Sequence, residues 1–201
     1  MQPQPIHFNQ VTFLKSAPTL GFSPPDKGIE IAFVGRSNAG KSSALNAIVS
    51  QSHLARKSKT PGRTQLMNYF EIDAERRLVD LPGYGFANVP DRTRKQIQVI
   101  LNTYLSERLC LYGVVLMMDI RHPLTKNDVT LLDFIASVDK PVHILLTKCD
   151  KISRSLANQT LSQVKDKLSS TQGTVTLQTF SALKNIGIEQ AQEVLTNWFQ
   201  F

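Results

Sequence analysis

The sequence predicts an α/β fold: a mostly parallel sheet with one antiparallel strand and helices on both faces. Short apolar runs alternate along the chain with longer, helix-compatible stretches. These stretches span about 12–25 residues, enough for helical crossovers between parallel strands. One pair of apolar runs is too close together for a crossover, which indicates the antiparallel strand. The 41% hydrophobic content suits a globular chain with a sizeable core and excludes a disordered one.

Six apolar runs are predicted to be buried strands, because they are short, rich in aliphatic residues and bounded by Gly, Pro or Asp. They are Ile29–Val34, Leu66–Ile72, Leu78–Leu81, Val114–Met118, Val142–Leu146 and Val175–Phe180. Only Asp73–Arg77 separates the second run from the third, which favours a hairpin. Helical stripes are formed by Leu131, Leu132 and Ile135, and by Ile188, Ala191, Val194, Leu195 and Trp198.

No linker or repeat divides the chain, so we expect one domain over residues 1–201, with residues 1–28 as a short N-terminal extension. The extension carries one strand-like piece, Val11–Leu14, and ends at Pro24-Pro25. Two cysteines make no disulfide framework, and no apolar stretch approaches the roughly 18 residues of a membrane span. Without a signal-peptide pattern, we expect a cytoplasmic monomer with no membrane span.

The net charge of +7 is concentrated in one part of the chain. Between Glu30 and Glu71 there is no acidic residue, whereas Lys and Arg contribute +6. An excess of this kind favours polyanionic partners such as nucleic acid or phosphates. A solvated basic face is the alternative for such a run. The cations are Arg36, Lys41, Arg56, Lys57, Lys59 and Arg63.

A phosphate-binding loop is predicted between the first strand and the helical stretch Ser43–Val49. The segment Gly35–Ser42 fits the pattern G-x-x-x-x-G-K-[ST] in the required strand–loop–helix context. Its glycines let backbone N–H groups approach phosphate oxygens, and the helix N-terminus adds partial positive charge. We expect Lys41 to reach the β- and γ-phosphates and Ser42 to ligate Mg²⁺. The expected contacts are Gly35, Arg36, Ser37, Asn38, Ala39, Gly40, Lys41, Ser42 and Ser43.

The tetrapeptide Thr147-Lys148-Cys149-Asp150 indicates guanine as the base. It follows the strand Val142–Leu146, at the edge where open parallel sheets bind ligands. The Asp150 carboxylate can accept hydrogen bonds from the ring N–H and amino group of guanine, a donor pair that adenine lacks. We expect the Lys148 stem to cover the base and Thr147 to tie this loop to the phosphate loop. Phe180, Ser181 and Ala182 follow the last strand and can reach the same base edge.

Two further segments are predicted to hold Mg²⁺ and the γ-phosphate. Asp80-Leu81-Pro82-Gly83 ends a strand, so Asp80 can hold the Mg²⁺ shell through water and the Gly83 N–H can reach the γ-phosphate. Within Thr60–Thr64, a hydroxyl on a mobile loop can complete the Mg²⁺ shell only with the γ-phosphate present, which makes a switch. We favour Thr64 over Thr60 because it lies next to the following strand. The expected metal ligands are Ser42, Thr64 and Asp80.

These segments resemble the EngB (YihA/YsxC) family of bacterial GTPases, within the translation-factor-like P-loop GTPases. The matching pieces run in order from Gly35 to Ala182: GRSNAGKSS, KTPGRTQ, DLPGYGFA, MDIRHPLTKND, TKCD and FSA. MDIRHPL, at Met118–Leu124, carries no obvious nucleotide chemistry and is specific to the family. Ala39 stands where Val is expected and Phe86 where Tyr is usual. Neither departure affects a ligand role.

The resemblance implies a Ras-like fold, GTP and GDP as substrate and product, Mg²⁺ as cofactor, and a role in large ribosomal subunit assembly and in cell division and septation. It supports the choice of Thr64 and gives catalytic roles to Lys41, Thr64 and Gly83. It also implies nucleotide contacts from the segments around the switch loop, the strand-ending turn and the base. These are Gly62, Arg63, Thr64, Gln65, Leu66, Asp80, Leu81, Pro82, Gly83, Thr147, Lys148, Cys149, Asp150, Phe180, Ser181 and Ala182.

One catalytic part is missing from the sequence. Ras-like enzymes orient the attacking water with a Gln directly after the Asp-x-x-Gly turn, and this chain has Tyr84 there. We therefore expect slow intrinsic turnover, accelerated by a partner or by K⁺, for which Asn38 is the candidate residue. Two other classes stay open: a phosphotransferase or ATPase with the same loop, and a division scaffold with negligible catalysis. The basic run predicts contact with ribosomal RNA.

Overall fold

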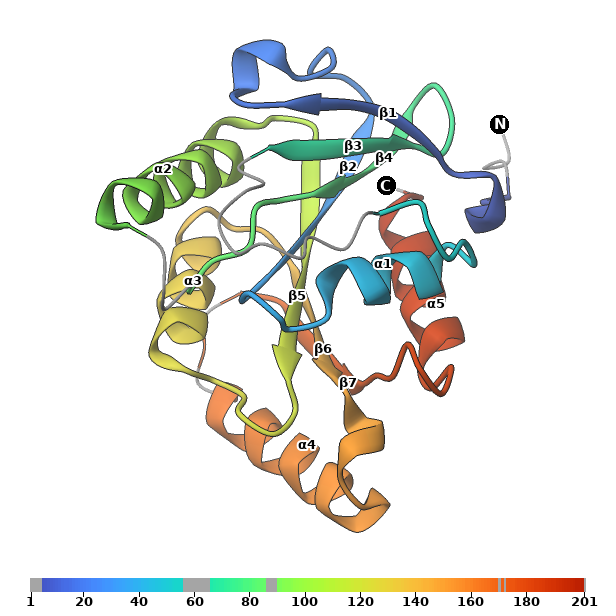
Figure 1. Ribbon diagram of the computed structural model, residues 1–201, viewed down its shortest axis with the longest axis vertical. Coiled ribbons are helices and arrows are strands. Elements are labelled where there is room, and N and C mark those ends of the chain that lie inside the picture. The colour runs from blue at the N-terminus through green and yellow to red at the C-terminus, as the bar shows by residue number, and fades with distance from the viewer. Residues whose placement is uncertain (1–4, 56–65, 86–89, 170, 172, 201) are drawn as a thin grey trace.

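A seven-stranded sheet forms the centre of the molecule, with helices on both faces (Figure 1). The computed structural model describes residues 5–55, 66–85, 90–169, 171 and 173–200. The strands are β1 (Thr12–Ala17), β2 (Ile29–Gly35), β3 (Met67–Glu71), β4 (Arg76–Asp80), β5 (Leu111–Asp119), β6 (Val142–Thr147) and β7 (Val175–Thr179). The α-helices are α1 (Lys41–Ile48), α2 (Asp91–Glu107), α3 (Lys126–Ser137), α4 (Arg154–Leu168) and α5 (Ile188–Trp198).

The strand order is β1-β3-β4-β2-β5-β6-β7. From β4 through β7 every neighbouring pair is parallel, whereas β3 is antiparallel to both β1 and β4. The predicted hairpin is therefore confirmed, and with it the single antiparallel strand. Its turn is closed by Asp73, whose carboxylate accepts hydrogen bonds from the backbone N–H groups of Glu75 and Arg76 at 3.0 and 2.9 Å.

The two faces of the sheet bury separate apolar clusters because side chains alternate along each strand. On one face, β-strand residues such as Val34 and Leu116 pack with α2, α3 and α4. On the other, Phe33 and Met117 pack with α1 and α5. Figure 1 shows α1 and α5 side by side on their face. This three-layer arrangement confirms the predicted fold class and brings the carboxyl ends of β2, β4, β5 and β6 to one edge.

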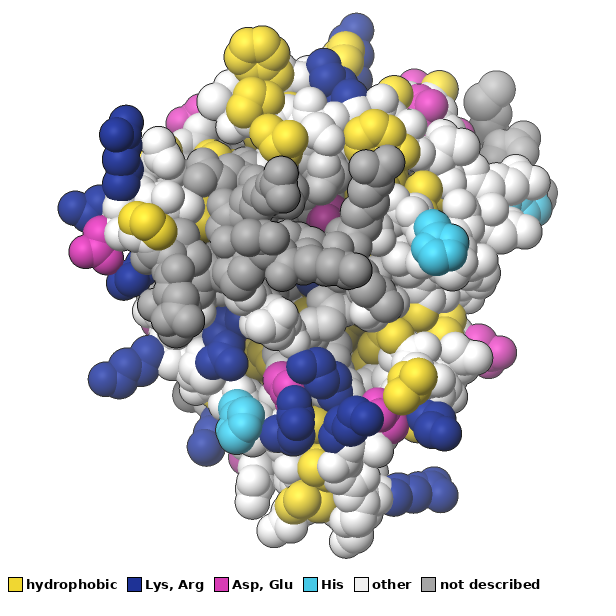
Figure 2. Space-filling view, viewed as in Figure 1, with side chains coloured by type: hydrophobic (Ala, Val, Ile, Leu, Met, Phe, Trp, Pro, Cys, Tyr) yellow, Lys and Arg dark blue, Asp and Glu magenta, His cyan; other side chains and the backbone are white. Residues whose placement is uncertain are grey.

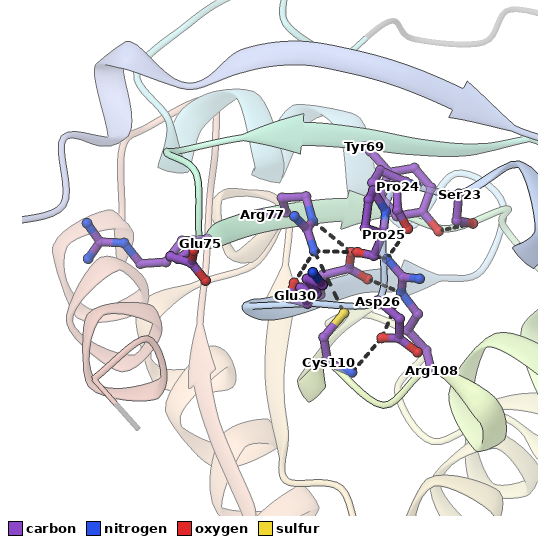
Figure 3. Close-up of polar contacts among 12 residues, drawn as sticks. Ser23, Pro24, Pro25, Asp26, Glu30, Tyr69, Glu75, Arg77, Arg108 and Cys110 are labelled. Atoms are coloured by element: carbon purple, nitrogen blue, oxygen red, sulfur yellow. Dashed lines mark hydrogen bonds and ion pairs between the residues drawn. The ribbon is translucent and has the colours of Figure 1, made fainter.

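The strand-like piece of the N-terminal extension is the edge strand β1, which pairs with β3. The chain between β1 and β2 then passes the amino ends of the parallel strands, where Glu30 of β2 is fully buried (Figure 3). Glu30 accepts from Arg77 at 2.8 Å, from Arg108 at 2.6 and 2.8 Å, and from the Tyr104 hydroxyl at 2.8 Å. Arg108 also donates to the carbonyl of Pro24 at 2.9 Å. The extension is thus fastened to the sheet and to the end of α2.

No α-helix among the described residues is both long enough and apolar enough to cross a bilayer.

Candidate nucleotide-binding site

The loop from Gly35 to Lys41 turns sharply between β2 and α1. Asn38 and Gly40 have φ of +63° and +91°, a left-handed conformation that Asn and Gly adopt at least cost. The Ala39 N–H donates to the Arg36 carbonyl at 2.9 Å and closes the turn. The first N–H groups of α1 have no partner within the helix and are available to an anion. Gly35 is also required, because a Cβ there would lie 2.8 Å from the Met117 carbonyl oxygen.

The amino group of Lys41 contacts the Asp80 carboxylate as an ion pair. Lys41 is the first residue of α1 and Asp80 the last of β4, so the contact joins the phosphate loop to the strand-ending turn. Both side chains are largely buried. The cation expected at the β- and γ-phosphates and the carboxylate expected at Mg²⁺ are therefore neighbours in the fold.

The base loop after β6 is bonded directly to the phosphate loop. The buried Thr147 hydroxyl donates to the Ala39 carbonyl at 2.6 Å, the tie that the sequence led us to expect. Lys148 has φ of +60°, and its amino group donates to the Asn38 carbonyl at 2.6 Å. These two contacts hold the two loops in one register.

Asp150 lies opposite Ser181, at the end of β7. The Ser181 hydroxyl donates to the Asp150 Oδ1 at 2.6 Å, and this hydrogen bond lowers the pKa of the carboxyl group. Asp150 is therefore ionised at neutral pH, and each of its oxygens keeps acceptor capacity for a ligand. The loop is closed further by the Cys149 N–H, which donates to the Phe180 carbonyl at 3.2 Å. Burial raises the pKa of the Cys149 thiol, consistent with a spacer and not a nucleophile.

A cavity of about 1230 Å³ lies against Gly40 and the base loop, and it extends along α1 as far as Ser52 and onto the first turns of α5. It is large enough for a nucleoside. Its walls bring together motifs that lie more than a hundred residues apart in the sequence. The lining residues from those motifs are Gly40, Ser43, Thr147, Lys148, Asp150, Phe180 and Ala182.

Tyr84, at the position of the expected Gln, is fixed in the structure. Its buried hydroxyl donates to the Asp128 Oδ1 at 2.6 Å, while Thr125 bonds the other oxygen of that carboxylate in a capping box at the start of α3. Burial and the Asp128 charge both raise the pKa of Tyr84. The Tyr84 backbone accepts from the Ser37 N–H at 2.9 Å and donates to the Gly35 carbonyl at 3.3 Å. The residue thus joins the turn to the phosphate loop.

The sequence motif MDIRHPL contributes a contact that motif reasoning missed. Asp119 ends β5, and its carboxylate accepts from the Lys148 amino group at 2.9 Å and from the Arg121 guanidinium at 2.9 and 2.6 Å. Burial opposes ionisation of Asp119, but these hydrogen bonds outweigh it and hold the pKa of the carboxyl group below its usual range. The available signal was its position, an Asp at a strand tip like Asp80.

Other predicted contacts divide into those the structure restricts and those it does not describe. The Leu81 side chain is fully buried in the core, so only its backbone could meet a ligand, and its N–H is taken by the Phe33 carbonyl at 3.0 Å. Pro82 is buried, Gly83 is half-buried and Leu66 is exposed. Outside the described residues lie Arg56, Lys57, Lys59, Thr60, Gly62, Arg63, Thr64, Gln65 and Phe86.

The donors around Lys41 fit Mg²⁺. Hydroxyl and carboxylate oxygens, here from Ser42 and Asp80, are the ligands that this cation prefers. Among the described residues, no group of three or more His, Cys, Asp or Glu side chains could hold a metal ion. Mg²⁺ in nucleotide sites is usually held by one or two protein groups together with phosphates and water, so a cage of side chains is not needed.

Comparison with known proteins agrees with this geometry. A family model described as "50S ribosome-binding GTPase" matches residues 30–148. A probable GTP-binding protein EngB of Methylobacillus flagellatus is 51% identical over 191 residues, which is 95% of this chain and 92% of that protein. The corresponding protein of Glaesserella parasuis is 49% identical over 194 residues, 96% of this chain and 93% of its own. This chain belongs to the EngB family of GTPases.

The EngB family fold is also found among solved structures. A probable GTP-binding protein EngB has a TM-score of 0.69 at 21% identity, covering 85% of this chain and 98% of that one. Era, in complex with MgGDPNP and a segment of 16S ribosomal RNA, has a TM-score of 0.65 at 22% identity over 86% of this chain and 57% of its own. These likenesses extend the Ras-like fold to this chain. The family also makes it a GTP hydrolase, not a general phosphotransferase or ATPase.

Proposed function

We propose that this GTPase binds guanine through Asp150 and phosphate through Gly35–Ser42, with Mg²⁺ held by Ser42, Asp80 and Thr64, and that it acts in assembly of the large ribosomal subunit and in cell division and septation. The observation that carries the base assignment is the ionised Asp150 held by Ser181 at 2.6 Å in the wall of the cavity. The ribosomal role is supported by the description of the matching family.

Asp150→Asn tests the base assignment. The exchange replaces an acceptor by a donor, which suits the carbonyl of xanthine and mismatches the amino group of guanine. We expect GTP affinity to fall by at least about a hundredfold and xanthosine triphosphate to become the preferred ligand. Titration with both fluorescent nucleotides measures the exchange. A variant that keeps the selectivity of the parent for GTP would overturn the assignment.

The chain's own residues would assist hydrolysis by binding and orientation. Lys41 neutralises charge on the β- and γ-phosphates, and the Gly83 N–H donates to the γ-phosphate. Mg²⁺, when bound, neutralises charge on the same phosphate oxygens. Tyr84 is engaged by Asp128 and is not available to orient water. Intrinsic turnover should therefore be about 10⁻³ s⁻¹ or slower.

Acceleration would then come from a partner or from K⁺ near Asn38. Asn38 is exposed and has φ of +63°, as a turn residue does. Turnover measured in K⁺ and in Na⁺ separates the possibilities. A rate that is higher in K⁺ supports a cation role, and equal rates leave Asn38 as a turn residue and favour a partner.

Binding to ribosomal subunits is the decisive test of the assembly role. Cations gather on the face shown in Figure 2, in the part above α4, and the segments after β5 and β6 include the exposed Arg121, Lys126, Lys151 and Arg154. We expect the protein to sediment with large subunits more strongly with a non-hydrolysable GTP analogue than with GDP. If nucleotide state does not change sedimentation, the alternative of a division scaffold with negligible catalysis is favoured.

A further inference from the structure

The segment after β5 contacts the base loop although motif reasoning gave it no nucleotide chemistry. Asp119 and Thr147 are paired in the register of β5 and β6, so the two strands end side by side. The Ile120 N–H donates to the Thr147 carbonyl at 3.0 Å. The carboxylate of Asp119 is therefore presented at the start of the base loop.

We propose that Asp119 is a positioning residue of the nucleotide site, which acts by holding Lys148 in its working conformation. The Lys148 amino group is shared between the Asp119 carboxylate at 2.9 Å and the Asn38 carbonyl at 2.6 Å. One end of this bridge is in β5 and the other is in the phosphate loop. The inference rests on the guanine-nucleotide site proposed above.

Lys148 needs such a partner because its side chain is long and its backbone conformation is uncommon. Four rotatable bonds leave a lysine many rotamers, and an ammonium without a protein partner stays hydrated and mobile. Lys148 is in the left-handed region, which a residue other than Gly adopts at a cost. An ionised partner at the strand end fixes the ammonium before the nucleotide binds. The Lys148 side chain therefore loses less conformational entropy on binding.

Arg121 keeps Asp119 in place. Its guanidinium donates to both carboxylate oxygens of Asp119, and its backbone N–H also donates to Asp119 Oδ1, at 3.1 Å. The planar fork of Arg fits a carboxylate in this two-pronged way. Asp119 is largely buried while the Arg121 side chain is close to half exposed. Arg121 thus orients the carboxylate from the solvent side, and Lys148 takes its remaining acceptor capacity.

The experiment is a double-mutant cycle of Asp119→Asn and Lys148→Ala, read by dissociation constants for fluorescent GDP and a GTP analogue. Asp119→Asn should weaken binding by about tenfold, the effect of losing one charge-assisted hydrogen bond. In the Lys148→Ala background the same change should have an effect below about twofold, because the positioned group is gone. Asp133→Asn, on the exposed face of α3, is the control for charge and should leave both constants unchanged.

A merely structural role of Asp119 predicts a different pattern. It would lower the urea midpoint and weaken nucleotide binding by the same factor in both backgrounds, and either equal factors or an unchanged affinity in Asp119→Asn would overturn the proposal. Midpoints measured on all four proteins show whether each is folded at the assay temperature. Loss of guanine-nucleotide binding by the parent protein itself would instead contradict the nucleotide site, so the two failures are distinguishable.

Discussion

Tyr84 has a structural role at the position where Ras-like enzymes have a catalytic Gln. Its hydroxyl donates a hydrogen bond to the buried Asp128, and its backbone forms hydrogen bonds with the phosphate loop. We expect Tyr84→Phe to lower the free energy of unfolding by about 1.5–3 kcal/mol, because a buried carboxylate oxygen loses a charge-assisted hydrogen bond. Urea denaturation measures this loss.

Single-turnover GTP hydrolysis by Tyr84→Phe separates a structural from a catalytic hydroxyl. The rate should stay within about twofold of the parent, because the hydroxyl is directed at Asp128 and not at water. A tenfold loss of rate in a variant that is still folded at the assay temperature would show that the hydroxyl takes part in hydrolysis.

His143 in β6 makes stability depend on pH. Its ring nitrogens lie 2.8 Å from the Thr176 hydroxyl and 2.9 Å from the Gln178 oxygen, and burial lowers its pKa. The unfolded chain binds the proton with an ordinary pKa near 6.5, so acid favours unfolding. Below pH 6.5, His143 should therefore remove up to about 1.4 kcal/mol of stability per pH unit, until its folded-state pKa is passed.

Urea denaturation between pH 5 and pH 8, in about half-unit steps, measures the His143 contribution. His143→Gln should flatten the slope below pH 6.5, whatever its stability at pH 8. The exposed His122→Gln serves as the control and should keep the parent slope. An unchanged slope in His143→Gln would assign the pH dependence to other groups.

At the scale of elements, Glu30 joins β2 to β4 and to the end of α2 (Figure 3). Strand β2 leads into the phosphate loop Gly35–Ser42, β4 ends at Asp80, and α2 follows the turn after Asp80. The cluster lies at the amino ends of the parallel strands, opposite the nucleotide edge. Backbone carbonyls of the extension complete it, since Arg77 donates to the Pro25 carbonyl at 3.1 Å. The extension thus supplies hydrogen-bond acceptors to the buried guanidinium groups.

Glu30→Gln should be strongly destabilising. Removing the carboxylate charge deprives buried Arg77 of its ion-pair partner and leaves Arg108 only the more distant Asp26, at 3.6 Å, at a cost of about 3–5 kcal/mol. Thermal and urea unfolding measure the loss, with the exposed Glu107→Gln as the matched control. A loss below about 1 kcal/mol would mean that water or the backbone carbonyls compensate both cations.

At the scale of the whole molecule, the net charge of +7 is concentrated in the run of cations between Glu30 and Glu71, for which we expect two roles. Arg36 and Lys41 belong to the phosphate loop, and Lys41 contacts Asp80. The other cations of the run are expected to meet RNA. Charge-neutral substitution of Arg56, Lys57 and Lys59 together should weaken ribosome binding and reduce its salt dependence, because each phosphate contact releases counterions.

Sedimentation over a series of salt concentrations measures the effect of that triple variant, and nucleotide titration supplies the control. GTP affinity should stay near that of the parent. Equal losses of ribosome and nucleotide binding would mean that the run serves the nucleotide alone.

The local motifs and the strand–helix alternation could be predicted because they depend on consecutive residues. A Gly-rich loop between a strand and a helix specifies its own backbone, and apolar runs of five or so residues report burial directly. The antiparallel β3 followed from the short spacing Asp73–Arg77. The tie between Thr147 and Ala39 followed from two motifs that share one sheet edge.

Only the tertiary structure decided which polar side chains meet across the fold. The contacts of Asp119 with Lys148, Tyr84 with Asp128, and Glu30 with Arg108 join residues 29 to 78 positions apart, and they depend on strand register and helix docking. No local pattern encodes such pairings, because each depends on the packing of every element between the partners. The sequence by itself thus determined the fold class and the phosphate and base motifs, while packing determined how Lys148 and Tyr84 are held.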